Sequence, residues 1–204
     1  MATEQHPDRI TAGKAIFPST NFTSTNTVVL QYPISTVFPI IGTSEGHNRV
    51  VRLSSLCSQS DTQQRESVAL PRGASLATAS VRTDPAADPN DAAFSNTILL
   101  PRQHFTLTEE IPVLFSLVTK SVHIEGTLTW DESARITLYE SQTNLGVTIW
   151  KLRRFYETKE GGTKIVETIE GNCAAWMKHL VQGQTRKAHR DHMELYHTLF
   201  ESSD

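Results

Sequence analysis

The chain has 204 residues, of which 38% are hydrophobic and 20% charged, with a formal net charge of −3. This balance is typical of a globular protein with a hydrophobic core. It gives no electrostatic reason to expect nucleic acid or an anionic membrane as a partner. Two cysteines so far apart in sequence, Cys57 and Cys173, make neither a disulfide framework nor a four-cysteine zinc site. We therefore expect a cytoplasmic protein with reduced thiols.

The N-terminal part of the sequence predicts a loose segment followed by short elements. Residues 1–26 are polar and have no apolar core of a signal peptide, so we expect a flexible arm preceding a single domain over 27–204. No stretch of the chain has the apolar length of a membrane helix, which argues against membrane insertion. A β-rich run over 27–32 predicts the first strand, ended by Pro33. Ser35 is expected to cap a short helix that ends at Gly42, and residues 50–53 fit either a strand or a short helix.

Residues 71–97 are small, polar and punctuated by proline. A connection of this length in a compact domain is either disordered or functional, for example as a lid over a pocket, and the sequence leaves both readings open. From residue 97 onward the β signal dominates. Short turns join the expected strands, which predicts an antiparallel meander. The strands are expected at 97–100, 103–109, 117–128, 134–141, 146–157 and 163–170, with Pro101 and Pro112 favouring an edge or a bend.

The last expected element is a long amphipathic helix over 174–200. Its apolar stripe follows helical spacing and comprises Met177, Val181, Gln184, Ala188, His192, Leu195 and Leu199. A helix of this kind cannot bury its stripe alone and must lie against the sheet. We therefore expect an α+β fold in which a strongly curved antiparallel sheet wraps around the long C-terminal helix and encloses an apolar ligand cavity.

Several segments resemble the START-like (SRPBCC) superfamily of helix-grip proteins, which includes the Bet v 1-like allergens and the polyketide cyclase/dehydratase branch. The segments that carry the resemblance are VVLQYPISTVF at 28–38, WKLRRFY at 150–156, GGTKIVE at 161–167 and AHRDHM at 188–193. The resemblance is diffuse, spans roughly residues 27–200, and contains no invariant catalytic signature. It implies a helix-grip fold and an internal cavity for a hydrophobic ligand.

The resemblance leaves two functions to weigh. The preferred one is a cofactor-independent enzyme of secondary metabolism that cyclises, dehydrates or isomerises a hydrophobic, oxygenated substrate. The alternative is a non-catalytic carrier or sensor of a lipid, sterol or polyketide, and an interaction module with a filled core is a third reading. The expected partner is thus a hydrophobic small molecule, with no nucleic acid; a homodimer is left open.

Two residues are the candidates for proton transfer. His192 lies on the edge of the helix stripe and titrates near neutrality, although such a histidine is more often a satisfied core residue. Glu140 is expected on the same strand face as the apolar residues Ile136 and Leu138. It is therefore either a desolvated acid or a solvated residue at the end of the strand. His189 and His192 have a spacing that can share a metal, but no further ligand accompanies them, so no metal and no cofactor are predicted.

The candidate ligand-binding residues come from two neighbouring strands. One face of the strand over 146–157 combines amphipathic aromatic side chains with a guanidinium, which suits a cavity; the alternative is that this face is core or solvated. The opposite face of that strand holds Val147, Ile149, Lys151, Arg153 and Phe155, and the sequence does not decide which face points inward. The predicted ligand-binding residues are Tyr139, Trp150, Arg154 and Tyr156.

Overall fold

The computed structural model describes residues 20–82, 84–88, 90, 96–113 and 118–201. Strand β1 (Phe22–Leu30) is followed by two short helices, α1 (Ile34–Gly42) and α2 (His47–Val51). Six strands and the C-terminal helical segments follow. They are β2 (Cys57–Pro71), β3 (Thr97–Val113), β4 (Val118–Asp131), β5 (Ile136–Thr143), β6 (Thr148–Glu157), β7 (Thr163–Asn172), η2 (Ala175–Met177), α3 (Lys178–Glu194) and η3 (Leu195–Leu199).

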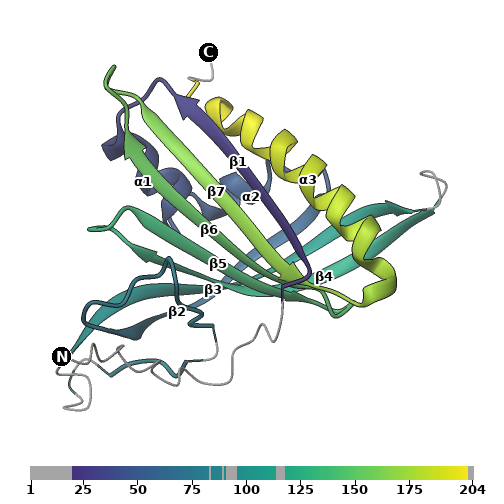
Figure 1. Cartoon of the computed structure of the whole chain (residues 1–204), viewed down its shortest axis with the longest axis horizontal. Helices are drawn as coiled ribbons and strands as arrows, with labels where there is room; N and C mark the ends of the chain where they lie inside the picture. Colours follow the sequence, from purple (N-terminus) through teal and green to yellow (C-terminus); the bar gives the residue numbers. More distant parts are fainter. Residues whose placement is uncertain (1–19, 83, 89, 91–95, 114–117, 202–204) are drawn as a thin grey trace, which may run out of the picture.

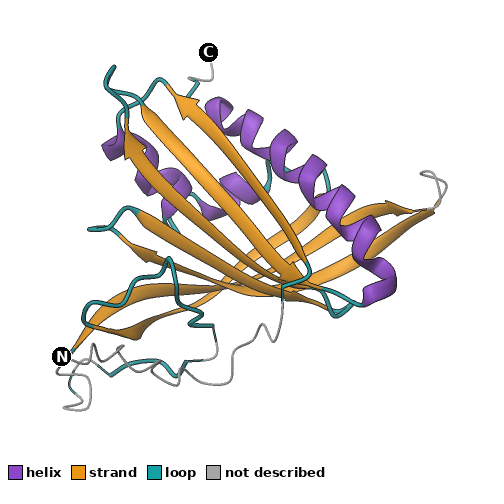
Figure 2. Cartoon of the chain, in the orientation of Figure 1, coloured by secondary structure: helices purple, strands orange, loops and turns teal. Residues whose placement is uncertain are grey.

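The strands form one seven-stranded antiparallel sheet in the order β1-β7-β6-β5-β4-β3-β2 (Figure 1). Strands β2 to β7 are therefore neighbours in chain order, as the short turns predicted, and β1 returns beside the last strand. Two of these turns contain a glycine in the left-handed region, Gly146 at φ 74° and Gly161 at φ 82°. A side chain is disfavoured in that region, so glycine fits both turns. Figure 2 shows the sheet dominating the molecule, with helices on one side.

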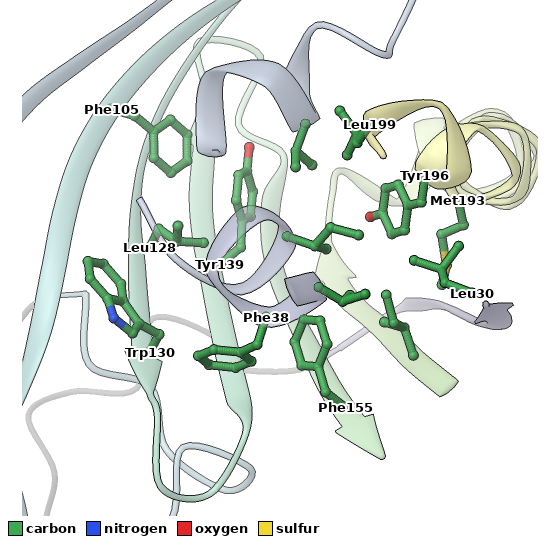
Figure 3. Close-up of a cluster of buried hydrophobic side chains, with 14 of the residues drawn as sticks. Leu30, Phe38, Phe105, Leu128, Trp130, Tyr139, Phe155, Met193, Tyr196 and Leu199 are labelled. Carbon is green, nitrogen blue, oxygen red and sulfur yellow. The ribbon is translucent and has the colours of Figure 1, made fainter. Parts of the chain in front are cut away.

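The inner face of the sheet, defined as the side that faces α1, α2 and η3, carries the largest hydrophobic cluster. Phe38 of α1 lies at its centre, with its ring edge-on to the ring of Phe155 at a centroid distance of 5.0 Å, and Phe105 stacks on Tyr139 at 4.8 Å (Figure 3). Tyr196 of η3 is fully buried at the other end of this cluster. The short helices, with aromatic side chains above and below them, thus fill the inner face.

The outer face of the sheet is covered in part by the connection between β2 and β3. Leu76 and Val81 of this connection are each 1% exposed and pack against Leu138 and Leu152 of the central strands. An isolated bridge between Val68 and Ala86 ties the connection to β2. The described residues of the segment expected to be a disordered loop or a lid therefore form a packed cover.

The expected α+β fold, in which a strongly curved sheet wraps around the C-terminal helix, is wrong; the observed arrangement, an open seven-stranded sheet with a helix packed on it, is compatible with a helix-grip fold. The sheet is open, and α3 lies along β1 at one end of it rather than within its grip (Figure 1). The physical reason is that α3 has little apolar surface to bury: His189 and Met193 are its buried residues, whereas Gln184 and Ala188 of the predicted stripe are exposed. The buried residues are His189, Met193 and Tyr196. Each comes one position after a residue of the predicted stripe.

Several element boundaries also differ from the expected ones. Strand β1 begins at Phe22, inside the expected flexible arm, because Phe22 is 2% exposed and packs with Val147 and Ile169. Strand β2 was not expected, since most of its sequence is polar and its burial is irregular. It forms the last strand at one end of the sheet, where such a composition is tolerated.

Strand β3 is continuous, although two separate strands were expected from its prolines. Pro101 pairs with β2 outside the stretch that pairs with β4, which starts at Arg102. Pro112 pairs with β4 beyond Glu109, where the pairing with β2 ends. Each proline therefore lies where β3 has a single neighbour and a missing N–H is tolerated. Among the described residues, no helix is long and apolar enough to cross a bilayer.

Candidate functional site

The structure divides the residues predicted from sequence between the two faces of the sheet. Alternation along the strands places Glu140, Trp150, Arg154 and Tyr156 on the outer face. Tyr139 points to the inner face, where it joins the main hydrophobic cluster. His192 also lies on the inner side, since its ring meets Tyr196. The predicted proton-transfer pair, Glu140 and His192, is therefore not brought together.

Glu140 and Trp150 hold the cover of the outer face in place. The carboxylate of Glu140, 1% exposed, accepts hydrogen bonds from the Ser80 hydroxyl at 2.6 Å and from the Val81 N–H at 3.0 Å. Burial raises the pKa of Glu140 above its ordinary value, and these bonds oppose the rise. The indole N–H of Trp150 donates to the Ala79 carbonyl at 2.8 Å. The hydrogen bonds of both side chains thus go to the covering segment.

The remaining two predicted ligand-binding residues are more open. Arg154 is half-buried, and Tyr156 is 48% exposed near the end of β6. Neither side chain has a hydrogen-bond partner within the described part of the chain. Their predicted role in ligand binding is therefore neither supported nor opposed by a local contact.

A buried ionic cluster on the inner face is centred on Glu167, which is 0% exposed. Arg153 donates to one oxygen of its carboxylate through Nε, and the Tyr196 hydroxyl donates to the same oxygen at 3.2 Å. His189 Nε2 lies 2.9 Å from the other oxygen, while its Nδ1 lies 3.0 Å from the Ser24 hydroxyl. Burial alone would raise the pKa of Glu167, but the Arg153 and Lys151 charges hold it well below its usual range. This cluster joins β1, β6, β7 and the C-terminal helices.

Lys151 is next to Arg153 on this face, yet its ammonium is not part of the ion pair. Its Nζ lies 4.4 Å from the centroid of the Tyr139 ring, which is a cation–π contact. Within the described residues the ammonium has no hydrogen-bond partner and no carboxylate in ion-pair contact. Burial lowers the pKa of Lys151, and the Glu167 charge partly opposes this. Glu109 of β3 is near enough to interact with Lys151; burial raises the pKa of Glu109.

His47, the first residue of α2, lies above the same ring. It is 3% exposed, and its ring centroid is 4.7 Å from Phe105 and 6.4 Å from Tyr139. Its Nε2 has no hydrogen-bond partner among the described residues. Burial, with the Arg153 and Lys151 charges, lowers the pKa of His47 to about 3. The imidazole is therefore neutral at physiological pH and has one unused polar atom.

His192 has a more evident structural role. Its Nε2 lies 2.7 Å from the Val50 carbonyl, and since a carbonyl can only accept, this nitrogen carries the proton and donates. Burial is the main cause that lowers the pKa of His192 to about 4. This bond links α3 to α2. The other ring nitrogen stays available as an acceptor in this tautomer.

We define the inner-face site as His47, Glu109, Tyr139 and Lys151, of which sequence reasoning found Tyr139 alone. Lys151 and Arg153 were assigned to one strand face, but nothing in the sequence indicated that this face is buried. Glu167 lies two residues from both Ile165 and Ile169, which places it on the same strand face as these apolar side chains. This pattern could have indicated a buried carboxylate. Nothing in the local sequence marks His47 or Glu109.

Of the surface depressions formed by the described residues, the two best defined are open and differ from the enclosed apolar cavity that was expected. One, of about 550 Å³, lies between β3 and β4 and is lined by polar residues that include Arg82, His104, Glu125 and Gln142. The other, of about 420 Å³, lies between β1 and α3. Neither is lined by His47, Glu109, Tyr139 or Lys151, although Phe105, which stacks on Tyr139, lines the larger one. The described residues contain no group of three potential metal ligands among histidine, cysteine, aspartate and glutamate.

Comparison with known proteins supports the fold and leaves the function open. No family model matches the chain, and no curated protein matches it. Among solved structures, it is similar to the protein TTHA0849 from Thermus thermophilus, with a TM-score of 0.52 and 12% sequence identity. The match covers 86% of this chain and 94% of that one. At this identity the likeness shows a shared fold and does not show membership of the START-like superfamily.

Proposed function

We propose that the protein binds a hydrophobic, oxygenated small molecule at the inner-face site and transforms it by acid–base chemistry. The observation that carries the proposal is a pair of polar groups beside Tyr139 that have no hydrogen-bond partner among the described residues: the half-buried Lys151 ammonium and the buried His47 Nε2. Buried polar groups normally have partners, so groups without one are candidates for binding a ligand. A carbonyl oxygen could accept a hydrogen bond from His47 Nε2 and place its neighbouring carbon beside Lys151.

The electrostatics of the site suit proton transfer. Burial lowers the pKa of Lys151 and raises the pKa of Glu109, so both pKa values shift in the direction of neutral pH. Groups whose pKa values approach the working pH are effective as general base and general acid. Lys151, as the neutral amine, would remove a proton next to the substrate carbonyl and become the ammonium, and Glu109, as the protonated carboxyl, would return a proton and become the carboxylate. Cyclisation, dehydration or isomerisation would follow from these steps without a cofactor.

Access to the site requires a movement of the chain. The inner face is filled by aromatic side chains, and α2, which carries His47, is a five-residue helix without a side-chain cap at its N-terminus. A short element of this kind has a small free energy of local opening. The ligand would therefore enter while α2 opens and would lie against Tyr139 and Phe105 once α2 has returned His47 to the site.

A carrier or sensor is the second candidate, because apolar packing dominates the inner face. Lys151→Met and Glu109→Gln distinguish it from the enzyme, with Lys164→Met on an exposed lysine as the control. For an enzyme, both site variants retain ligand binding within about tenfold but lose turnover, since they remove proton transfer. For a carrier, ligand affinity alone changes. The predicted roles of His192 and Glu140 are tested in the same assay with His192→Phe and Glu140→Gln.

The first experiment is native mass spectrometry of the purified protein, followed by extraction of any bound small molecule. A bound aromatic polyketide, terpenoid or alkaloid supports the proposal and names the substrate class. A mixture of fatty acids favours the carrier. A protein that carries nothing and also fails to bind a hydrophobic fluorescent probe contradicts both.

Two broader expectations belong with this proposal. Membership of the START-like superfamily is retained as a hypothesis that a bound polyketide or sterol would support. A cytoplasmic location agrees with the two free thiols, Cys57 and Cys173.

A further inference from the structure

The edge of β1 that faces away from β7 is accessible for pairing. Within the described part of the chain, β1 is the end strand of the sheet and has β7 as its sole strand neighbour. Helix α3 runs beside β1 on the side that faces away from β7 (Figure 1). The Gln182 side chain of α3 accepts a hydrogen bond from the Thr23 N–H at 3.1 Å and donates one to the Thr23 carbonyl at 2.6 Å. A side-chain amide thus takes the place that the backbone of another strand would occupy.

The next backbone groups along this edge are unused. In an antiparallel strand the N–H and C=O of a residue point to the same side, and the side alternates with each residue. Because those of Thr23 point away from β7, those of Thr25 and Thr27 do as well. These groups have no hydrogen-bond partner among the described residues. An edge of this kind can accept an added strand.

A groove with a positive wall follows this edge. The depression of about 420 Å³ is lined by Thr23, Ser24, Thr25 and Asn26 of β1 and by Arg186 and Arg190 of α3. The two arginines are four residues apart and therefore share one helix face. Both are exposed, and no carboxylate lines the depression. Asp191 is the nearest acidic residue in sequence, and it pairs with Lys187 at 2.6 Å and with Arg190 at 3.4 Å.

We propose that this groove binds an extended acidic peptide segment of another protein, which adds a strand to β1. The peptide backbone pairs with Thr25 and Thr27, and carboxylates at alternate positions of the peptide meet Arg186 and Arg190. A second copy of this chain is a poorer occupant. Strand β1 contains no acidic residue, so pairing of β1 with its own copy offers the arginines no negative partner.

The test measures binding of a fluorescently labelled eight-residue peptide of alternating valine and glutamate to the full chain by anisotropy. A peptide of alternating valine and lysine is the control. The glutamate peptide is expected to bind at least about tenfold more tightly, because opposite charges attract across the groove. The double variant Arg186→Glu with Arg190→Glu reverses this preference.

Backbone pairing is tested separately from charge. Thr25→Pro removes the outward N–H but leaves the pairing with β7 intact, so it is expected to weaken peptide binding at least about fivefold. Thr25→Val retains the N–H and binds as the wild type does. Circular dichroism verifies that both variants are folded, and the amides of Thr25 and Thr27 exchange more slowly with the peptide bound.

Three results would overturn the proposal. Equal peptide affinity of Thr25→Pro and Thr25→Val would show that no strand is added. Displacement of the peptide by millimolar inorganic phosphate, with no protection of the Thr25 amide, would indicate a simple anion site. A dimer in analytical ultracentrifugation that Thr25→Pro abolishes would assign the edge to a second copy of the chain.

Discussion

Glu167 connects four elements through one carboxylate. Arg153 and Tyr196 bind one of its oxygens and His189 approaches the other, so strands β6 and β7 and the C-terminal helices share a single buried charge. A buried ion pair contributes little net stability when intact, but loss of one partner leaves the other charge uncompensated. This makes Glu167 more important to the fold than its few hydrogen bonds suggest.

Glu167→Gln is therefore expected to lower the free energy of unfolding by about 3–5 kcal/mol, because the Arg153 guanidinium is left without a counter-charge. Urea denaturation at pH 7 measures the change. Glu170→Gln, an exposed glutamate on the same strand, is the matched control and should change stability by less than about 0.5 kcal/mol. A loss below about 1 kcal/mol for Glu167→Gln would mean that the cluster relaxes without it.

At the scale of elements, the segment between β2 and β3 acts as a cover rather than as a free loop. Arg102, 2% exposed, donates to the Val81 carbonyl at 2.5 Å and to the Asp84 carbonyl at 2.9 Å. Together with Glu140 and Trp150, it satisfies backbone groups that would otherwise be buried without partners. Glu140, which the sequence predicted to be catalytic, thus has a structural role in holding the cover.

Glu140→Gln is expected to release this cover, because Ser80 and Val81 donate to different oxygens of the carboxylate and an amide retains only one of them as an acceptor. Limited proteolysis with trypsin, which cleaves after Arg72 and Arg82, should then proceed faster than in the wild type. Glu125→Gln, an exposed residue of the neighbouring strand, is the control. Unchanged cleavage would show that Trp150 and Arg102 suffice to hold the segment.

The buried residues of helix α3, His189 and Met193, both lie in its C-terminal half. Gly183 lies in an exposed stretch, and a Cβ at this position meets no atom within 4 Å. Gly183→Ala is therefore expected to raise the free energy of unfolding by about 0.5–1 kcal/mol, since alanine has the higher helix propensity. Thermal melts measure this gain, and a decrease would indicate a contact that the free helix face does not reveal.

The whole molecule should lose stability as the pH falls below neutrality. His47 and His192 have folded-state pKa values of about 3 and about 4, below the ordinary value of 6.5. The unfolded chain therefore takes up protons first as the pH falls below 6.5. The stability present above the ordinary pKa is lost on the way down toward about pH 4, by up to about 1.4 kcal/mol per pH unit for each histidine.

Urea denaturation between about pH 7 and pH 5 tests this dependence. His47→Phe should reduce the slope by about half, because one of the two titrations disappears while the ring stacking on Phe105 remains. The exposed His179→Gln is the control and should leave the slope unchanged. A slope that His47→Phe leaves intact would assign the effect to other groups.

How far the sequence predicted the molecule depended on how local each signal was. The meander after residue 97 and the short turns that join its strands were predicted, because alternation and turn residues act over a few positions. Strand β2 was missed, since an end strand that is mostly solvent-exposed needs no apolar alternation. The inner-face site was largely missed for a different reason: His47, Glu109 and Lys151 come from three separate elements.

An antiparallel meander followed by a C-terminal helix could be derived from the order of the residues, because hydrophobic periodicity and turn chemistry are local. Which strand face points to the helices was settled by packing, since a face becomes inner when α1 and α2 cover it. Packing also settled that α3 lies along β1 instead of within the sheet, because His189, one of its two buried residues, lies against Glu167 and Ser24. Burial, which gives Lys151 and His47 their altered pKa values, is a property of the assembled elements and has no counterpart in the sequence of any one of them.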